Sequence, residues 1–108
     1  MKLSIVTGTF NSAATVRDTF DSVLSQTYKD YEYWVIDGGS KDGTVDIIKE
    51  YEPKFQGRMK WTSERDKGIY DAMNKGFMRS SGDVLMLINS DDLFARPDAL
   101  QLVNDKFE

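Results

Sequence analysis

Short apolar runs alternate with segments of helical periodicity along this whole sequence, and this alternation restricts the fold more than any other feature. Runs rich in β-branched and aromatic residues predict strands at residues 2–7, 31–37, 58–63 and 83–88. Apolar residues recur at helical spacing over residues 12–26, 44–51, 69–77 and 97–107. The expected order is β-α-β-α-β-α-β-α. Because such crossovers are right-handed, this order predicts a parallel sheet with helices on both faces, a Rossmann-like α/β fold.

Several residues predict where these elements begin and end. We expect Gly8 to end the first strand and Ser12 to cap the first helix. Pro53 should end the second helix, and Pro97 should open the last helix at its first turn. Residues 83–88, "DVLMLI", are apolar on both faces, which is typical of a central parallel strand.

Composition excludes several classes of protein. A length of 108 residues predicts one domain, 1–108. The net charge of -4 argues against a nucleic-acid partner, which would require a basic surface. Cysteine and histidine are both absent, which excludes disulfides, thiolate metal sites and histidine-dependent triads. Carboxylates therefore remain as the expected protein ligands for a metal.

The apolar runs also bear on location. None approaches the roughly 20 apolar residues that a helix needs to span a bilayer, so no transmembrane segment is expected. The first strand begins too close to the N-terminus for a signal peptide. We expect a cytoplasmic protein, either free or peripheral to the inner membrane.

Ligands of an open parallel sheet bind beyond the carboxyl ends of its strands, so the loops there are candidate sites. In residues 7–12, "TGTFNS", free backbone amides could meet an anion and Phe10 could stack on a base, although a plain turn explains the same residues. Residues 37–44, "DGGSKDGT", form neither a P-loop nor a GxGxxG motif and favour a turn. Asp37 is the exception, because a carboxylate at the end of a buried strand is costly without hydrogen bonds.

The remaining two loops are richer in charge. Residues 63–76 begin with a mixed-charge run that is typical of a solvated loop. Residues 88–92, "INSDD", place two carboxylates side by side, where they repel each other unless they are solvated, paired or metal-bound. A turn would explain an isolated pair. Its place after an apolar strand, beside three polar loops, favours Mg²⁺ or Mn²⁺, which bind through carboxylates and substrate phosphates.

Taken together, five segments resemble the nucleotide-binding half of the inverting family 2 glycosyltransferases, which have the GT-A fold. They are "TGTFN", "SQTY", "YWVIDGGSKDGT", "SERDKGIYDAMNKG" and "GDVLMLINSDD". The block "DKGIYDAMNKG" is similar to bacterial transferases of exopolysaccharide and lipopolysaccharide synthesis. The resemblance implies a partial GT-A domain that supplies the donor and metal site. The enzyme would transfer a sugar from a nucleotide-diphospho-sugar to a glycan or lipid-linked acceptor.

The resemblance also implies roles for particular residues. The expected donor-nucleotide contacts are Thr7, Thr9, Phe10, Asp37, Asp66, Lys67 and Asp91. Asp91 and Asp92 would bind Mn²⁺ or Mg²⁺. Two positions depart from the family pattern: Gly38 replaces the second Asp of a base-binding pair, and Asn89 replaces the first acid of an Asp-x-Asp metal motif.

The family's general base lies downstream of its metal motif, so we expect no catalytic residue within 1–108 and no activity from this chain alone. Two alternatives remain to be weighed. A non-catalytic nucleotide-sugar-binding or regulatory module fits the same motifs. A phospho-acceptor receiver domain fits poorly, because it needs an Asp after the third strand, where Ser63 stands. Apolar surface left exposed would favour a homodimer.

Overall fold

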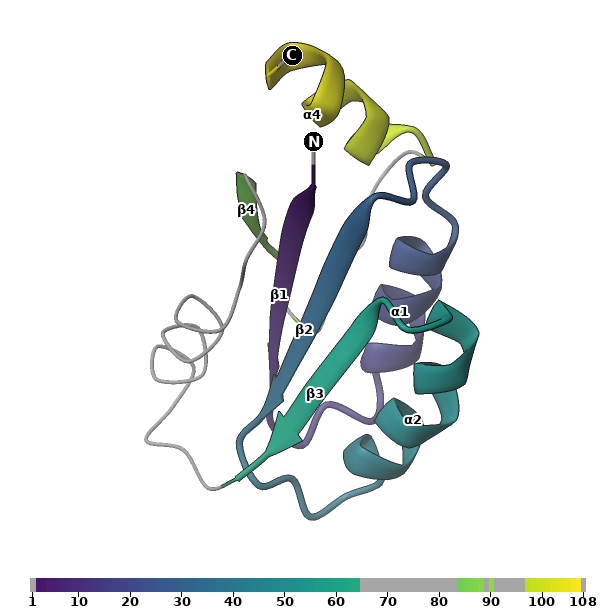
Figure 1. Cartoon of the computed structure of the whole chain (residues 1–108). Coiled ribbons are helices and arrows are strands. Elements are labelled where there is room, and N and C mark those ends of the chain that lie inside the picture. Colours follow the sequence, from purple (N-terminus) through teal and green to yellow (C-terminus); the bar gives the residue numbers. More distant parts are fainter. Residues whose placement is uncertain (1, 65–83, 89, 91–96, 108) are drawn as a thin grey trace.

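The sheet is parallel and four-stranded (Figure 1), in a computed structural model that describes residues 2–64, 84–88, 90 and 97–107. Its elements are β1 (Leu3–Thr9), α1 (Val16–Leu24), β2 (Tyr31–Asp37), α2 (Thr44–Tyr51), the 3₁₀ helix η1 (Glu52–Phe55), β3 (Met59–Ser63), β4 (Val84–Leu87) and α4 (Ala99–Phe107). The strands lie in the order β3-β2-β1-β4. The predicted α/β fold with a parallel sheet is confirmed. The helix predicted over 69–77 lies outside the described residues.

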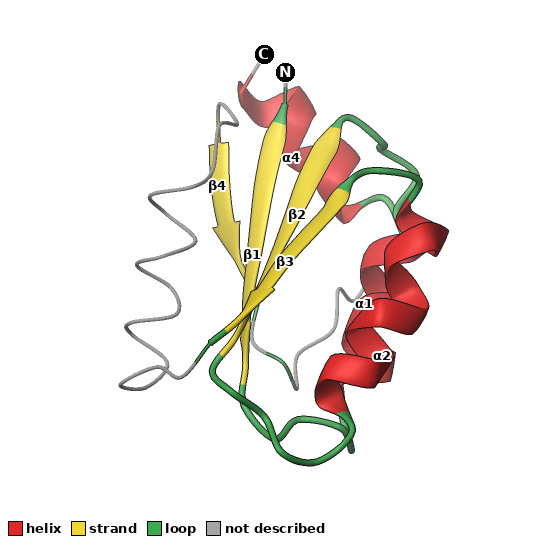
Figure 2. Ribbon diagram, turned by 60° about the horizontal axis from the view of Figure 1, so that its bottom comes forward, coloured by secondary structure: helices red, strands yellow, loops and turns green. Residues whose placement is uncertain are grey.

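The core lies between the sheet and helices α1 and α2, which run side by side over one face (Figure 2). Alternate strand residues point to this face, as the period of two requires. The buried cluster includes Leu3, Ile5, Tyr33 and Val35 from the strands and Val16, Phe20, Val23, Ile47 and Ile48 from the helices. The Phe20 ring lies 6.0 Å from Tyr33 and 5.2 Å from Tyr51, centroid to centroid. These aromatic contacts join α1, α2 and β2 at the centre of the domain.

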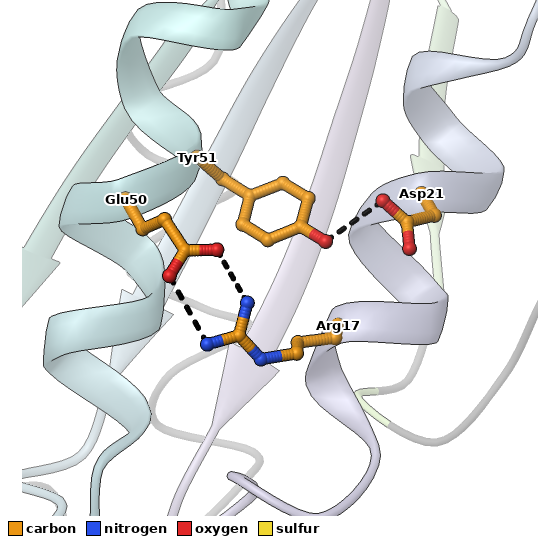
Figure 3. Close-up of polar contacts among 4 residues, drawn as sticks. All are labelled: Arg17, Asp21, Glu50 and Tyr51. Carbon is orange, nitrogen blue, oxygen red and sulfur yellow. Dashed lines mark hydrogen bonds and ion pairs between the residues drawn. The ribbon is translucent and has the colours of Figure 1, made fainter.

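Polar contacts join α1 to α2 above this core (Figure 3). The Arg17 guanidinium donates to both carboxylate oxygens of Glu50. The Tyr51 hydroxyl donates to Asp21 Oδ1 at 2.8 Å. Glu50 and Tyr51 are neighbours on α2, and Arg17 and Asp21 are one turn apart on α1. The two contacts therefore set the same relative position of the helices.

Three predicted boundaries were wrong. Gly8 does not end β1, because Gly8 and Thr9 continue the pairing to Ile36 and Asp37. Ser12 does not cap α1, which begins at Val16; the Ser12 hydroxyl contacts the Phe10 backbone and Ser90 instead.

At the other end of the chain, Pro97 precedes α4 instead of opening it, since the helix begins at Ala99. The Pro97 carbonyl accepts a hydrogen bond from the backbone of Thr27. Pro53 behaves as predicted, because α2 ends at Tyr51 and Pro53 lies in η1.

The position of β4 also differs from expectation. In the part of the chain that the structure describes, β4 pairs with β1 and forms the edge of the sheet, and Leu87 is 46% exposed. Residues that are apolar on both sides therefore do not make this strand central within the described sheet. Across the same described ranges, no helix has both the length and the apolar character to cross a membrane.

Candidate functional site

Three strands end in one row of polar residues. The register pairs Thr9 of β1 with Asp37 of β2, and Asp37 with Ser63 of β3. Paired residues of adjacent parallel strands point to the same face of a sheet. The three side chains consequently meet. The Thr9 hydroxyl donates to Asp37 Oδ1 at 2.7 Å, and the Ser63 hydroxyl donates to Oδ2 at 2.9 Å.

Asp37 is the centre of this row. Beyond Thr9 and Ser63, its Oδ2 accepts from the backbone N–H groups of Gly39 at 3.0 Å and Ser40 at 2.8 Å, and Oδ1 accepts from the Ser40 hydroxyl at 2.6 Å. Gly39 has a φ of 86°, a left-handed conformation that suits glycine and lets both amides face the carboxylate. The loop after β2 is thus wrapped around one buried anion.

These hydrogen bonds also determine the charge of Asp37. Its side chain is fully buried, and burial alone would raise the pKa of the carboxyl. Donors from Ser40, Thr9 and Ser63 outweigh that effect and hold the pKa below its ordinary value. Asp37 is therefore ionised at neutral pH and anchors the loop. Its predicted contact with a nucleotide stays a prediction.

The loop after β1 is fastened to the loop after β2. Asn11 adopts a left-handed φ of 48°, which asparagine tolerates better than most residues. Its backbone N–H donates to the Ser40 hydroxyl at 2.7 Å, and its Oδ1 accepts from the Lys41 N–H at 2.8 Å. Phe10, immediately before this bridge, is 63% exposed. A rigidly held backbone thus presents an aromatic ring to solvent beside the Asp37 loop.

Thr7 lies deeper than the edge of the sheet. Its hydroxyl is 2.8 Å from the Tyr33 hydroxyl, and both side chains are fully buried. Burial raises the pKa of Tyr33 above its usual range, so the phenol stays protonated. The structure does not bring the Thr7 hydroxyl together with Phe10 at the surface, and its predicted role in a nucleotide pocket stays a prediction.

The segment after β4 is joined to the same end of the sheet. Ile88 is buried, and its N–H donates to the Val6 carbonyl at 3.0 Å. Ser90 is held by hydroxyl groups of Ser12, Thr15 and Thr19, from the start of α1 and the turn before it. Ser90 directly precedes Asp91 in the sequence. The structure thus connects the backbone leading into the acidic pair with the loop that carries Phe10.

These three hydroxyl residues were missed in the sequence. The signal was present, because positions 12, 15 and 19 follow the spacing i, i+3, i+7 and lie on one stripe of a helix. Asp42 was also missed as a connector. Its Oδ2 accepts from the Ala13 N–H at 3.1 Å, and its Oδ1 accepts from the Thr44 N–H at 3.0 Å.

The other predicted site residues, Asp66, Lys67, Asp91 and Asp92, lie outside the described residues. Among the residues that the structure does describe, no group of three or more acidic side chains could hold a metal ion. The predicted metal ligands therefore stay predictions.

A profile of the family Glycosyl transferase family 2 matches residues 4–108. An uncharacterized glycosyltransferase of Mycobacterium tuberculosis is 41% identical over 99 residues, which are 91% of this chain and 37% of that protein. A PGL/p-HBAD biosynthesis glycosyltransferase of Mycobacterium bovis is 37% identical over 100 residues, 93% of this chain and 39% of that protein. The chain thus spans well under half the length of these relatives.

Solved structures agree with these sequence relatives. TarS of S. aureus in complex with UDP superimposes with a TM-score of 0.84 at 22% identity, over 97% of this chain and 31% of that one. The mannosyltransferase PcManGT of Pyrobaculum calidifontis, in complex with GDP-Man and Mn²⁺, gives 0.81 at 23% identity, over 91% and 30%. At such identities the likeness establishes the fold, and the family follows from the sequence. The chain belongs to glycosyl transferase family 2 and has the GT-A fold of glycosyltransferases.

Proposed function

We propose that this chain forms the donor-binding part of an inverting, metal-dependent glycosyltransferase of bacterial surface polysaccharide synthesis. The enzyme would take a nucleotide-diphospho-sugar as donor and a glycan or lipid-linked molecule as acceptor. One observation carries the proposal: the loop with exposed Phe10, the loop anchored by Asp37 and the backbone of Ser90 all meet at one end of the sheet. In an open α/β sheet, this carboxyl end is where ligands bind.

The nucleoside would bind against the loop after β1. An exposed phenylalanine can stack on any base, because every base offers a π face. The bridge between Asn11 and Ser40 holds the backbone next to Phe10, so the ring needs little ordering before it meets a base. Asp66 and Lys67 would contact the base or ribose, and the Asp37 network would support the loop beneath them.

The diphosphate would lie toward the segment after Ser90. Asp91 and Asp92 supply carboxylate oxygens, which are the ligands that Mn²⁺ and Mg²⁺ bind, and the chain has neither histidine nor cysteine to compete. The fastened backbone of Ser90 supports the fit, because it leads directly into these carboxylates. A bound ion would neutralise the charge that develops on the departing nucleoside diphosphate. The acceptor hydroxyl would attack the anomeric carbon from the opposite side, with inversion.

The relatives support this proposal at a coarser level. The name of one relative places it in PGL/p-HBAD biosynthesis, and two structural neighbours were crystallised with UDP-GlcNAc or with GDP-Man and Mn²⁺. We therefore expect a nucleotide-diphospho-sugar donor here as well. Acceptor activation would belong to a group beyond Glu108.

Calorimetric titration of UDP-, GDP- and TDP-sugars, with and without Mn²⁺, tests the proposal. Wild-type protein should bind one nucleotide class, and Mn²⁺ should strengthen the binding. The double variant Asp91→Asn and Asp92→Asn should lose the Mn²⁺-dependent part. The matched control, Asp46→Asn with Asp105→Asn, removes the same charge from exposed positions on α2 and α4 and should bind normally. Unchanged Mn²⁺-dependent binding in the site variant would exclude the metal assignment.

A further inference from the structure

Hydroxyl groups around the start of α1 hold the backbone just before the acidic pair. Thr15 Oγ1 and Thr19 Oγ1 both donate to the Ser90 carbonyl oxygen, at 2.9 and 3.0 Å. The Ser12 hydroxyl donates to the Ser90 hydroxyl at 3.0 Å. A carbonyl oxygen has two lone pairs, so the two threonines fill its capacity. Ser90 is consequently fixed by three side chains that are more than 70 residues away in sequence.

A second attachment follows the acidic pair. The Pro97 carbonyl accepts from the Thr27 N–H at 2.8 Å. The Leu100 N–H, in the first turn of α4, donates to Gln26 Oε1 at 3.0 Å, and the Gln26 side chain is fully buried. Gln26 thus satisfies a free amide at the start of α4, a task that a capping residue of the helix itself usually performs. Tyr28 adds a third contact through its hydroxyl, which donates to Asn104 Oδ1 at 2.9 Å.

Both attachments come from one short stretch, residues 12–28, which contains α1. They hold Ser90 and Pro97, and the chain between these two residues contains Asp91 and Asp92. A flexible segment that must be ordered on binding lowers affinity, and attachment of both its ends reduces that loss. Residues that hold metal ligands from behind contribute to metal affinity without touching the ion.

The threonines have a cost that helix stability does not explain. Threonine is a weaker helix former than alanine because its branched side chain is restricted. A helical threonine hydroxyl commonly bonds to a carbonyl one turn earlier in its own helix. Thr19 instead donates to Ser90, 71 positions away. Two such residues on one stripe, directed at one carbonyl, indicate a function in placing Ser90.

We propose that Ser12, Thr15, Thr19 and Gln26 are positioning residues for the metal-binding carboxylates of Asp91 and Asp92. They hold the backbone on both sides of the pair and so raise its affinity for Mn²⁺ in the presence of a nucleoside diphosphate. This inference rests on the function proposed above, and it adds residues that contact neither the metal nor the donor.

Two matched double variants test the inference. Thr15→Val with Thr19→Val keeps the side-chain shape and removes both donors, whereas Thr15→Ser with Thr19→Ser keeps the donors. Free Mn²⁺ is measured by electron paramagnetic resonance during titration of MnCl₂ in the presence of UDP or GDP. The valine pair should lose roughly 10- to 100-fold in Mn²⁺ affinity, the size seen when outer-shell partners are removed. The serine pair should stay close to wild type.

Three further measurements separate the outcomes. Ser25→Ala removes an α1-end hydroxyl that donates to the Ser22 carbonyl, so it should leave Mn²⁺ affinity unchanged. Thermal unfolding shows whether each variant is folded, and Ser12→Ala replaces the valine pair if that pair is not. Wild-type Mn²⁺ affinity in a folded variant that lacks these donors would overturn the positioning role. Failure of the wild-type protein to bind Mn²⁺ with either nucleotide would instead overturn the proposed function.

Discussion

At the scale of single residues, Asp37 shows how one buried charge can organise a loop. Donors from Thr9, Gly39, Ser40 and Ser63 surround its carboxylate. Sequence reasoning recognised that a carboxylate at this strand end needs hydrogen bonds, and this is confirmed. The partners were not predicted, because the pairing of Thr9, Asp37 and Ser63 depends on the strand register, which no local pattern of residues specifies.

Asp37→Asn should therefore destabilise the protein. An amide NH₂ in place of one oxygen cannot accept from these donors, and unpaired buried groups cost about 1–3 kcal/mol each. Because the pKa of Asp37 is lowered in the folded state, its contribution is present above the ordinary pKa of about 3.9 and is lost as the pH falls through the folded pKa.

Urea denaturation measures this effect. The gap between wild type and Asp37→Asn should be full at pH 7 and should shrink as the pH falls below about 4. Asp46→Asn, at an exposed position of α2, is the control and should change the free energy of unfolding by less than about 0.5 kcal/mol. An equal gap at pH 7 and pH 3 would contradict the assigned charge state.

Phe10 is the opposite case, an apolar residue with no place in the core. Phe10→Ala should leave stability nearly unchanged, since the ring is 63% exposed. Loss of a base-stacking ring should weaken nucleotide binding by about 1–3 kcal/mol, roughly 5- to 150-fold. Calorimetry with the preferred nucleotide measures this loss. Leu102→Ala removes another exposed apolar side chain, 48% exposed on α4, and should bind like wild type. Equal affinities of the two variants would remove Phe10 from the site.

At the scale of elements, periodicity predicted the strands and helices well, because each element buries one regular face. β2 was predicted over 31–37 and is Tyr31–Asp37, and α2 was predicted over 44–51 and is Thr44–Tyr51. The start of α1 was wrong, because Ser12 makes contacts with Phe10, Thr44 and Ser90 that only the folded chain brings within reach. Boundaries set by distant contacts cannot be found from local patterns.

The attachment of α4 is likewise a property of elements. Gln26→Leu should leave the Leu100 N–H without its acceptor, which costs about 1–3 kcal/mol when the group is buried. Hydrogen exchange should become faster in α4, most clearly at Leu100, while β1 and β2 stay protected. Gln101→Leu is the control, because Gln101 bonds to Asp105 on the exposed side of the same helix. Uniformly faster exchange in the sheet and α4 would show that Gln26 stabilises the domain as a whole.

At the scale of the whole molecule, the parallel sheet explains why distant sequence segments share one site. Residues 9, 37 and 63 end adjacent strands, so the loops that follow begin side by side. That argument predicted which loops to consider and needed no side-chain contact. It could not predict the cross-links between loops, such as Asn11 with Ser40 or Ser12 with Ser90, because these depend on turn geometry.

A site built from several loops should report its ligands through the stability of the whole domain. A ligand that binds the folded state at 100 times its Kd adds about 2.7 kcal/mol to the free energy of unfolding. For a domain of about 100 residues, each kcal/mol raises Tm by roughly 4–8 °C. Nucleoside diphosphate with Mn²⁺ should therefore raise Tm by several degrees, and a chelator should remove most of that shift.

Asp91→Asn with Asp92→Asn should lose the same metal-dependent part of the shift and keep the part that Phe10 and its loop supply. Scanning calorimetry with nucleotide alone, with Mn²⁺ alone and with both separates the two contributions. A Tm shift by nucleotide that is identical with Mn²⁺ and with chelator would show that the loops bind the nucleoside without a metal. In that case Asp91 and Asp92 would serve the donor through hydrogen bonds alone.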